Sequence, residues 1–229
     1  MSGWSIERAT GSAGALHARE LPDRPGRALW VLEVDAPALV LGSTQAEADV
    51  DHDAARRLAV EVVRRRSGGG AVLLDPGEVV WVDLVLPAGD PLWHDDVAVA
   101  AEWVGEVWSA ALAAVGLPGG RVHRGGLVRT PLAPVVCFAG TGPGEVLVEG
   151  AKVVGISQRR TRAAARFQCS VPLAWRPDRH VELLEPGLRR VSPDLAPDAA
   201  LAAVPVRALH DGVGLDPDRI VDALVELLP

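Results

Sequence analysis

Apolar residues form several short, nearly continuous runs, which is the pattern of buried β-strands. Residues 28–34 (ALWVLEV) and 38–42 (ALVLG) are two such runs. The stretch 71–87 (AVLLDPGEVVWVDLVLP) predicts two more strands, joined as a hairpin by the turn DPGE, because proline presets φ and glycine tolerates positive φ. Residues 145–158 predict a second hairpin, and 166–173 (RFQCSVPL) predict a further strand.

Three other segments repeat their apolar positions at helical spacing. The first can be capped by Asp51 and Asp53, and it is expected to end in the arginine- and glycine-rich stretch that follows. The second covers residues 95–115 and stops at Gly116, and the third begins at Asp216. The apolar positions are Ala55, Leu58 and Val62 in the first, Val97, Ala101, Val104, Trp108, Ala111, Leu112 and Val115 in the second, and Ile220, Leu224 and Leu228 in the third.

Length and composition fit a soluble globular protein. The 229 residues are 48% hydrophobic and 23% charged, which allows a large core. With the mixed order of strands and helices, this predicts an α+β fold in which residues 1–229 form a single domain. The N-terminus lacks a basic segment followed by an apolar run, and no apolar stretch is expected to reach the ~18 residues that span a bilayer. We therefore expect a cytoplasmic protein that has no membrane partner.

Charge and cysteine content exclude several classes of function. The formal charge of -7 argues against a nucleic-acid partner, because such proteins carry a basic surplus to neutralise phosphates. Cys137 and Cys169 lack CxxC pairing, and the six histidines are scattered. Neither a disulfide framework nor a metal site is therefore expected.

The stretch RRRSGGGAVLL at residues 64–74 is the first candidate for chemistry. It is not a phosphate-binding P-loop, since no GK[ST] follows, and Ser157 lacks the second glycine of a nucleophile elbow. Three consecutive glycines can still present backbone N–H groups to an anion, while Arg65 offers a charged, bidentate fork. The alternative is a glycine-rich turn with solvated arginines.

Lys152 is the second candidate, because it is the only lysine in the chain. It follows the turn of the hairpin predicted at 145–158, in an otherwise apolar stretch. An ammonium group there would be costly unless it met an anion. The alternative is an exposed side chain at the tip of the hairpin.

Together the two segments resemble the lipoate–protein ligase A family, which shares a fold superfamily with biotin protein ligases and octanoyltransferases. The family pattern RRxSGGGAV matches residues 64–72, and the pattern G(R)K(I/V)xGSxQR matches much of 150–159, with Ala151 and Ile156 as departures. The resemblance spans about residues 28–175. It implies the catalytic-domain fold of biotin and lipoate ligases, in which central mixed and antiparallel sheets are flanked by helices.

The resemblance implies a two-step acyl transfer that uses ATP with Mg²⁺. Lipoate or octanoate becomes an acyl-adenylate, which then acylates a lysine of a lipoyl domain of a 2-oxoacid dehydrogenase or of the glycine-cleavage H protein. Lys152 would contact the acyl carbonyl and the α-phosphate, and act electrostatically. The other residues implied in binding are Arg65, Ser67, Gly68, Gly69, Gly70, Ala71, Val72, Leu73 and Gly155, with the amides of Gly70 to Leu73 and the guanidinium of Arg65 on the phosphate.

An acyl chain needs an apolar slot. The candidates are the strand at 38–42, the run at 79–86 (VVWVDLVL) and the hydrophobic side of the glycine loop. Glu78 and Glu145 stand where the family usually has Asn or Asp, which leaves the adenine and metal contacts open. Many ligases also carry a C-terminal accessory domain, for which residues after 190 leave little room. A separate activating subunit is therefore a possible partner.

Two alternatives to the ligase remain. In related octanoyltransferases the acyl group passes through a cysteine thioester, and the VVCFAGTG context of Cys137 is similar. The apolar neighbours of Cys137 favour an inert core thiol instead. The other alternative is a homologue that binds ligand without catalysis, whereas biotin ligation is disfavoured because no GRGRxxR-like loop is present.

Overall fold

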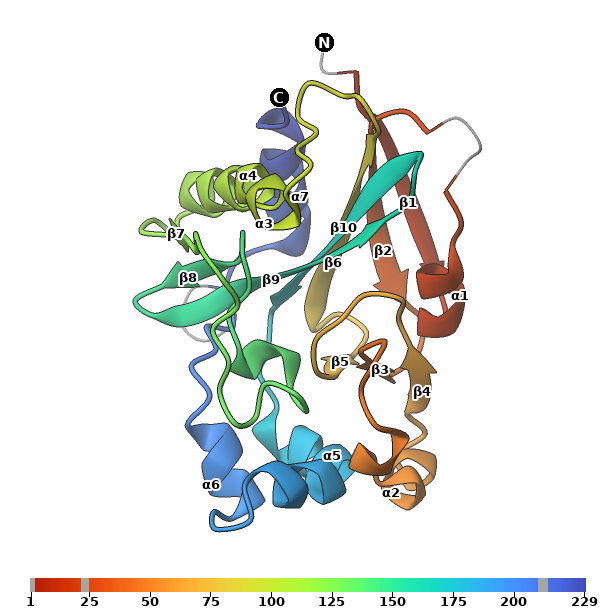
Figure 1. The fold of residues 1–229 in the computed structure, drawn as a ribbon, viewed down its shortest axis with the longest axis vertical. Coiled ribbons are helices and arrows are strands. Elements are labelled where there is room, and N and C mark those ends of the chain that lie inside the picture. Colours follow the sequence, from red (N-terminus) through yellow and green to blue (C-terminus); the bar gives the residue numbers. More distant parts are fainter. Residues whose placement is uncertain (1–2, 22–24, 210–213) are drawn as a thin grey trace.

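A computed structural model describes residues 3–21, 25–209 and 214–229. Its larger sheet has seven strands in the order β1-β2-β6-β10-β9-β8-β7 (Figure 1). Only β1 and β2 run parallel; the other neighbours are antiparallel. The strands are β1 (Ser5–Gly11), β2 (Ala28–Val34), β6 (Val79–Pro87), β7 (Arg121–Val122), β8 (Val146–Val148), β9 (Ala151–Arg160) and β10 (Ala164–Pro172). The predicted hairpin at 145–158 is confirmed as β8 and β9.

A smaller sheet has the order β4-β3-β5, with β3 (Ala38–Leu41) between β4 (Glu61–Arg64) and β5 (Val72–Leu74). The predicted hairpin at 71–87 is wrong in its pairing. The turn forms, because Glu78 N–H donates to Asp75 O at 3.0 Å, but β5 pairs with β3 while β6 pairs with β2 and β10. The chain therefore crosses between the two sheets at this turn.

The first predicted helix is also shorter than expected. The helix α2 (His52–Arg57) is capped by Asp51, whose side chain accepts from Ala54 N–H. Ala59 then adopts a φ of 53°, in the left-handed region that breaks a helix. Val62 consequently lies on β4, paired in parallel with β3, and not on the helix.

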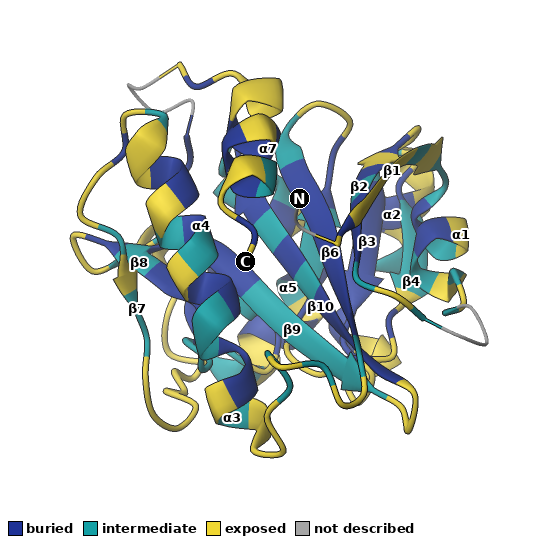
Figure 2. Cartoon of the chain, turned by 90° about the horizontal axis from the view of Figure 1, so that it is seen from above, coloured by how far each residue is buried: buried dark blue, intermediate teal, exposed yellow. Residues whose placement is uncertain are grey.

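The helices α4 (Glu102–Ala114) and α7 (Pro217–Glu226) cover one face of the larger sheet, as seen from above in Figure 2. The segment predicted as one helix at 95–115 is split into α3 (Val97–Ala100) and α4. The 18 residues of Val97–Ala114 are together long and apolar enough to cross a membrane, so the expectation of no such stretch is wrong. Trp108, Ala111 and Leu112 are nevertheless fully buried against the sheet. In this fold the segment packs as the core helix of this face.

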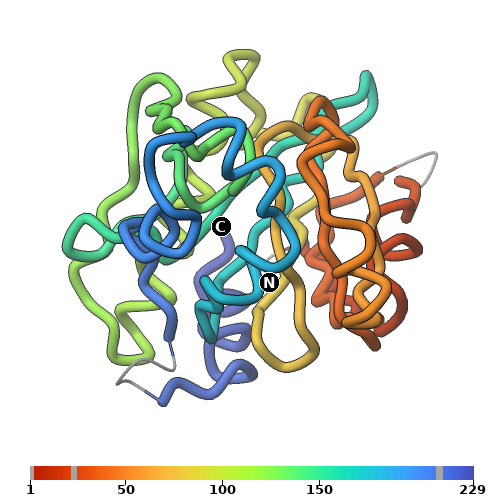
Figure 3. The backbone as a smooth tube through the Cα atoms, turned by 90° about the horizontal axis from the view of Figure 1, so that it is seen from below, coloured from red at the N-terminus to blue at the C-terminus, as the bar shows by residue number. Residues whose placement is uncertain are grey.

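The opposite face of the larger sheet meets α1 (Ala13–Ala18) and the smaller sheet (Figures 1 and 2). A third layer at the lower end contains α2, α5 (Pro177–Val191) and α6 (Pro197–Ala202). From below, residues 25–60 lie to one side and residues 115–145 to the other (Figure 3). The loops that carry both sequence motifs meet between these two sides.

Candidate functional site

The glycine loop, residues 66–71, is shaped by close backbone contacts. Gly69 has a φ of 98°, and its carbonyl oxygen would lie only 1.8 Å from a Cβ at Gly42. A Cβ on Gly70 would lie 2.6 Å from Val136 N. Gly68 has open space around it. Gly42 and Gly70 are therefore required for packing of the loop, whereas Gly68 is free to face a ligand.

Arg65 supports this loop from inside. The side chain is buried and donates to three carbonyl oxygens, at 3.0 Å to Val40, 2.7 Å to Gly68 and 2.8 Å to Gly70. These bonds satisfy acceptors that would otherwise be buried without partners. The guanidinium expected on a phosphate thus also holds the loop in shape.

The loop amides divide into two groups. Ala71 N–H donates to Val135 O at 2.8 Å, so it is not available to a phosphate as expected from the sequence. Val72 and Leu73 belong to β5, which pairs with β3 on one side only. Within the described residues, the N–H groups of Gly68 to Gly70 donate no hydrogen bond. Consecutive free amides of this kind attract anions.

Lys152 is buried, and its predicted need for an anion is confirmed within the protein itself. The ammonium nitrogen lies 2.8 Å from Glu145 Oε2 and 3.0 Å from Cys137 O. It also lies 5.1 Å from the centre of the Phe138 ring. Glu145 is fixed in turn, because it accepts from the N–H groups of Gly142 and Ile156. The hairpin of β8 and β9 thus delivers a neutralised, fixed cation to the interior.

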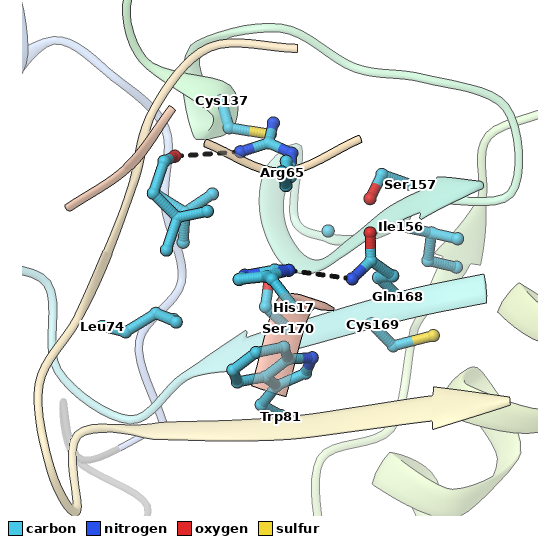
Figure 4. Close-up of a pocket in the computed structure, with 13 residues that line it drawn as sticks. His17, Arg65, Leu74, Trp81, Cys137, Ile156, Ser157, Gln168, Cys169 and Ser170 are labelled. Atoms are coloured by element: carbon cyan, nitrogen blue, oxygen red, sulfur yellow. Dashed lines mark hydrogen bonds between the residues drawn. The ribbon is translucent and has the colours of Figure 1, made fainter. Parts of the chain in front are cut away.

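A pocket lies between the two sheets, and we call it the apolar pocket (Figure 4). It brings together residues from the motifs and from the strands that were predicted to form an apolar slot. Its lining comprises His17, Val40, Arg65, Val72, Leu74, Trp81, Cys137, Gly155, Ile156, Ser157, Gln168, Cys169 and Ser170.

One wall of the apolar pocket carries a hydrogen-bonded polar chain. Ser67 Oγ lies 3.0 Å from Ser157 Oγ and donates to Gln168 Oε1 at 2.9 Å, and Gln168 Nε2 lies 3.1 Å from His17 Nδ1. Burial, together with the guanidinium groups of Arg65 and Arg166, lowers the pKa of His17 to about 3. The imidazole is therefore neutral near pH 7, and the wall carries no net charge from it.

A second pocket, which we call the charged pocket, lies beside β5. Its lining comprises Val72, Leu73, Asp75, Glu78, Val79, Phe138, Pro172, Ala174, Trp175, Arg176 and His180. Glu78 pairs with Arg176 at 2.5 Å, and Asp75 pairs with Arg179 at 2.5 Å. Burial raises the pKa of Asp75 above its ordinary value, although Arg179 opposes that shift. This pocket therefore presents both signs of charge beside an aromatic wall.

The two pockets adjoin at Val72, which lines both of them. Cys137 lines the apolar pocket and Phe138 lines the charged pocket. Lys152 lines neither pocket, but it contacts both Cys137 and Phe138, as its distances above show. A single fixed cation therefore lies directly behind a lining residue of each pocket.

The two cysteines differ from each other. Cys169 is completely buried, and burial raises its pKa well above the ordinary thiol value. Cys137 is only partly buried and lines the apolar pocket, with its sulfur 3.9 Å from Arg65 Nη2. Cys169 is therefore a core thiol, whereas Cys137 is not the fully buried thiol that its apolar neighbours predicted. In the described part of the chain, no group of three or more His, Cys, Asp or Glu side chains could hold a metal ion.

Several lining residues lie outside both motifs, so sequence reasoning missed them. His17 comes from α1, and Trp175 and His180 come from the segment after β10. Only tertiary packing brings them to the site. The single hint in the sequence is that tryptophan supplies most of the aromatic residues, with seven Trp against two Phe and no Tyr.

Three solved structures with a similar fold are described as lipoate protein ligases, one of them as a putative one. A Thermoplasma acidophilum bipartite lipoate protein ligase, described with its E2 lipoyl domain, is 17% identical over 98% of this chain and 82% of its own, with a TM-score of 0.70. Lipoate-protein ligase A bound with ATP is 17% identical over 99% of this chain and 84% of its own, with a TM-score of 0.70. The T. acidophilum protein Ta0514, described as a putative lipoate protein ligase with bound lipoic acid, is 17% identical. The match covers 93% of this chain and 75% of that protein, with a TM-score of 0.68.

These likenesses establish an α+β fold of the lipoate ligase type, as the sequence predicted. Comparison with curated proteins gives no significant sequence match. The profile of the lipoyl protein ligase A/B catalytic domain matches residues 15–224. The chain belongs to the lipoyl protein ligase A/B catalytic domain family.

Proposed function

We propose that the protein activates lipoate or octanoate with ATP and transfers the acyl group to a lysine of an acceptor domain. The observation that carries this proposal is the position of Lys152, whose ammonium group contacts Cys137 of the apolar pocket and Phe138 of the charged pocket. A reaction between an apolar acid and a charged nucleotide needs this arrangement. It holds two unlike ligands with their reacting ends at one fixed cation.

The acyl chain would occupy the apolar pocket, and the nucleotide would occupy the charged pocket. The free amides of Gly68, Gly69 and Gly70 are suited to the phosphates, which ATP brings as its Mg²⁺ complex. The family's complexes with lipoic acid and with ATP support these two ligands.

The acceptor would be a lipoyl domain or the glycine-cleavage H protein, and the bipartite T. acidophilum ligase with its E2 lipoyl domain supports the first. A separate activating subunit fits that bipartite precedent.

In the first step, a carboxylate oxygen attacks the α-phosphorus, and the bond to pyrophosphate breaks. In the second step, the neutral amine of the acceptor lysine attacks the acyl carbonyl carbon. The bond to AMP then breaks, and the amine proton leaves. Negative charge grows on oxygen in both steps. Lys152 stabilises that charge without forming a bond.

Cys137 supports a second candidate function, an ATP-independent acyl transfer. Its sulfur faces the apolar pocket, 3.9 Å from Arg65 and next to the carbonyl that Lys152 contacts. A thiolate there could attack the thioester of an acyl-carrier protein and release the carrier thiol. The acyl group would then pass from Cys137 to the acceptor lysine.

The donor requirement distinguishes the two functions. Exchange of labelled pyrophosphate into ATP, dependent on octanoate or lipoate, is expected of the ligase. Synthetic octanoyl-adenylate should acylate a lipoyl domain even where activation needs another subunit. Cys137→Ser should retain both activities. An octanoyl adduct on Cys137, formed without ATP and seen by intact mass, would support the transferase. Absence of all three activities indicates the homologue that only binds ligand.

A further inference from the structure

Trp81 lies at the end of the apolar pocket that is remote from Lys152. Figure 4 shows Cys137 and Arg65 at one end of the pocket and the indole of Trp81 at the other. The Cys137 end is the reacting end, because Lys152 contacts the carbonyl of Cys137. A chain that enters from the reacting end therefore runs toward Trp81.

The indole of Trp81 is fixed on two sides. Its Nε1–H donates to Asp83 Oδ1 at 2.8 Å, and its ring packs on the imidazole of His17 with 4.4 Å between ring centres. Asp83 is itself completely buried and accepts from Arg166 Nε at 2.6 Å. Swinging the indole aside would break a buried hydrogen bond and an aromatic contact.

His17 is held just as firmly. Its Nδ1 meets Gln168, and Arg166 donates to the carbonyl oxygens of Leu16, His17 and Arg19 at the end of α1. The helix, the histidine and the indole are thus tied to the same pair of sheet strands, β6 and β10. A longer ligand would therefore have to displace side chains that are fixed by these hydrogen bonds and ring contacts.

We propose that Trp81, held in place by His17, is the end wall of the acyl slot and sets the length of acyl chain that the protein accepts. The inference rests on the proposed function, because it takes the apolar pocket as the acyl site. The substrate class is a medium-length acid with an uncharged tail, since no unpaired charge faces the tail beside Trp81, Leu74 and neutral His17. Chains longer than this meet the indole.

The test compares straight-chain acids from hexanoate to tetradecanoate. Affinity is measured by calorimetry, and activation by pyrophosphate exchange. In Trp81→Leu the optimum should shift by two or more carbons toward longer chains, with about fourfold tighter binding for each methylene that gains room. His17→Ala, which frees the indole without removing it, should broaden the profile in the same direction. Trp30→Leu is the matched control, because Trp30 is equally buried at 2% against 3% but does not line the pocket.

The outcomes are distinct for the inference and for the proposed function. If the wild type exchanges pyrophosphate with octanoate and both variants keep its chain-length optimum, Trp81 is not the end wall and the ligase function stands. If no acid supports exchange, the ligase function fails, and the calorimetric profiles alone decide the inference. A shift of equal size in Trp30→Leu would also overturn it. If Trp81→Leu does not fold, the profile of His17→Ala decides.

Discussion

The two pockets at Lys152 share one structural device but differ in charge. Each has a tryptophan packed against a histidine with 4.4 Å between ring centres, Trp81 with the partly buried His17 and Trp175 with the buried His180. Burial lowers the pKa of His17 to about 3 and that of His180 to about 4. Both walls are therefore uncharged and rigid at neutral pH.

The surroundings of these two walls decide what each pocket can hold. Around Trp175, the carboxylates of Asp75 and Glu78 and the guanidinium of Arg176 offer partners for polar groups. Among the residues that the structure describes, Arg65 is the only charged side chain that lines the apolar pocket, and it is bonded to the carbonyls of Val40, Gly68 and Gly70. The same kind of aromatic wall thus suits an uncharged tail in the apolar pocket and a polar ligand in the charged pocket. Val72 lines both pockets, and Lys152 contacts one lining residue of each.

Removal of Lys152 should produce the largest effect, because it breaks the link between the pockets. In Lys152→Met we expect acyl activation to fall by ~100-fold or more, as for the loss of other preorganised charge-stabilising groups. Binding of octanoate alone to the apolar pocket should persist. Pyrophosphate exchange and calorimetry measure these two quantities.

The same change should also lower stability, which needs a control. Without its cation, Glu145 is a buried carboxylate whose remaining partners are backbone amides, and such losses cost ~3–5 kcal/mol. Lys152→Met combined with Glu145→Gln should recover most of the unfolding free energy while activity stays lost. Recovery of activity in the double variant would exclude an electrostatic role for Lys152.

Two glycines of the loop should separate packing from ligand contact. Gly70→Ala places a Cβ 2.6 Å from Val136 N, so we expect a loss of several kcal/mol in unfolding free energy. Gly68→Ala meets nothing and should change stability by less than ~0.5 kcal/mol. The added Cβ would instead enter the open space beside the free loop amides, so Gly68→Ala should weaken ATP binding. Urea unfolding and calorimetry together check both statements, and equal stability of the two variants would contradict the packing argument.

The sequence predicted the fold class and most elements because their signals are local. The tight turn before Lys152, the cap at Asp216 and the stop at Gly116 each lie within a few residues of the element they define. The end of α2 was not predictable in this way. Ala55, Leu58 and Val62 fit helical spacing, yet Val62 is extended because β4 pairs with the much earlier strand β3, in which Leu39 is the partner of Val62.

The site was predicted only as far as its motifs reach. The glycine loop and Lys152 both contact Cys137, and the apolar pocket includes Val40, Val72 and Trp81 from the segments that were predicted to form an apolar slot. Lys152 is paired with Glu145, and the Ala71 N–H donates to Val135 O. Both contacts depend on how the loop before β8 packs against the site. His17 and Trp175 reach the pockets from distant segments. No periodicity or spacing encodes such contacts.

Trp175→Ala should change the charged pocket and leave the apolar pocket intact. If an aromatic base packs on this indole, its removal should weaken ATP binding by about 5- to 150-fold, the range for loss of base stacking. Octanoate binding should be unchanged, since Trp175 does not line the apolar pocket. Calorimetric titration with each ligand measures the difference. Equal weakening of both ligands would mean that the pockets are not separate.

Acid should lower the unfolding free energy through His17 and the buried His180, because the pKa values of both fall on folding. A histidine whose pKa falls from 6.5 to about 4 on folding binds its proton more tightly when unfolded. Its contribution to stability is therefore complete above pH ~6.5 and declines as the pH drops from there toward 4. Between pH 7 and pH 5, His180 alone should lower the unfolding free energy by ~2 kcal/mol.

His180→Phe keeps a ring against Trp175 but cannot titrate, and Arg176 O still accepts from the backbone N–H of residue 180. Urea unfolding at both pH values should show a loss for His180→Phe that is smaller by that amount, whereas an unchanged loss would show that His180 is not the group that titrates.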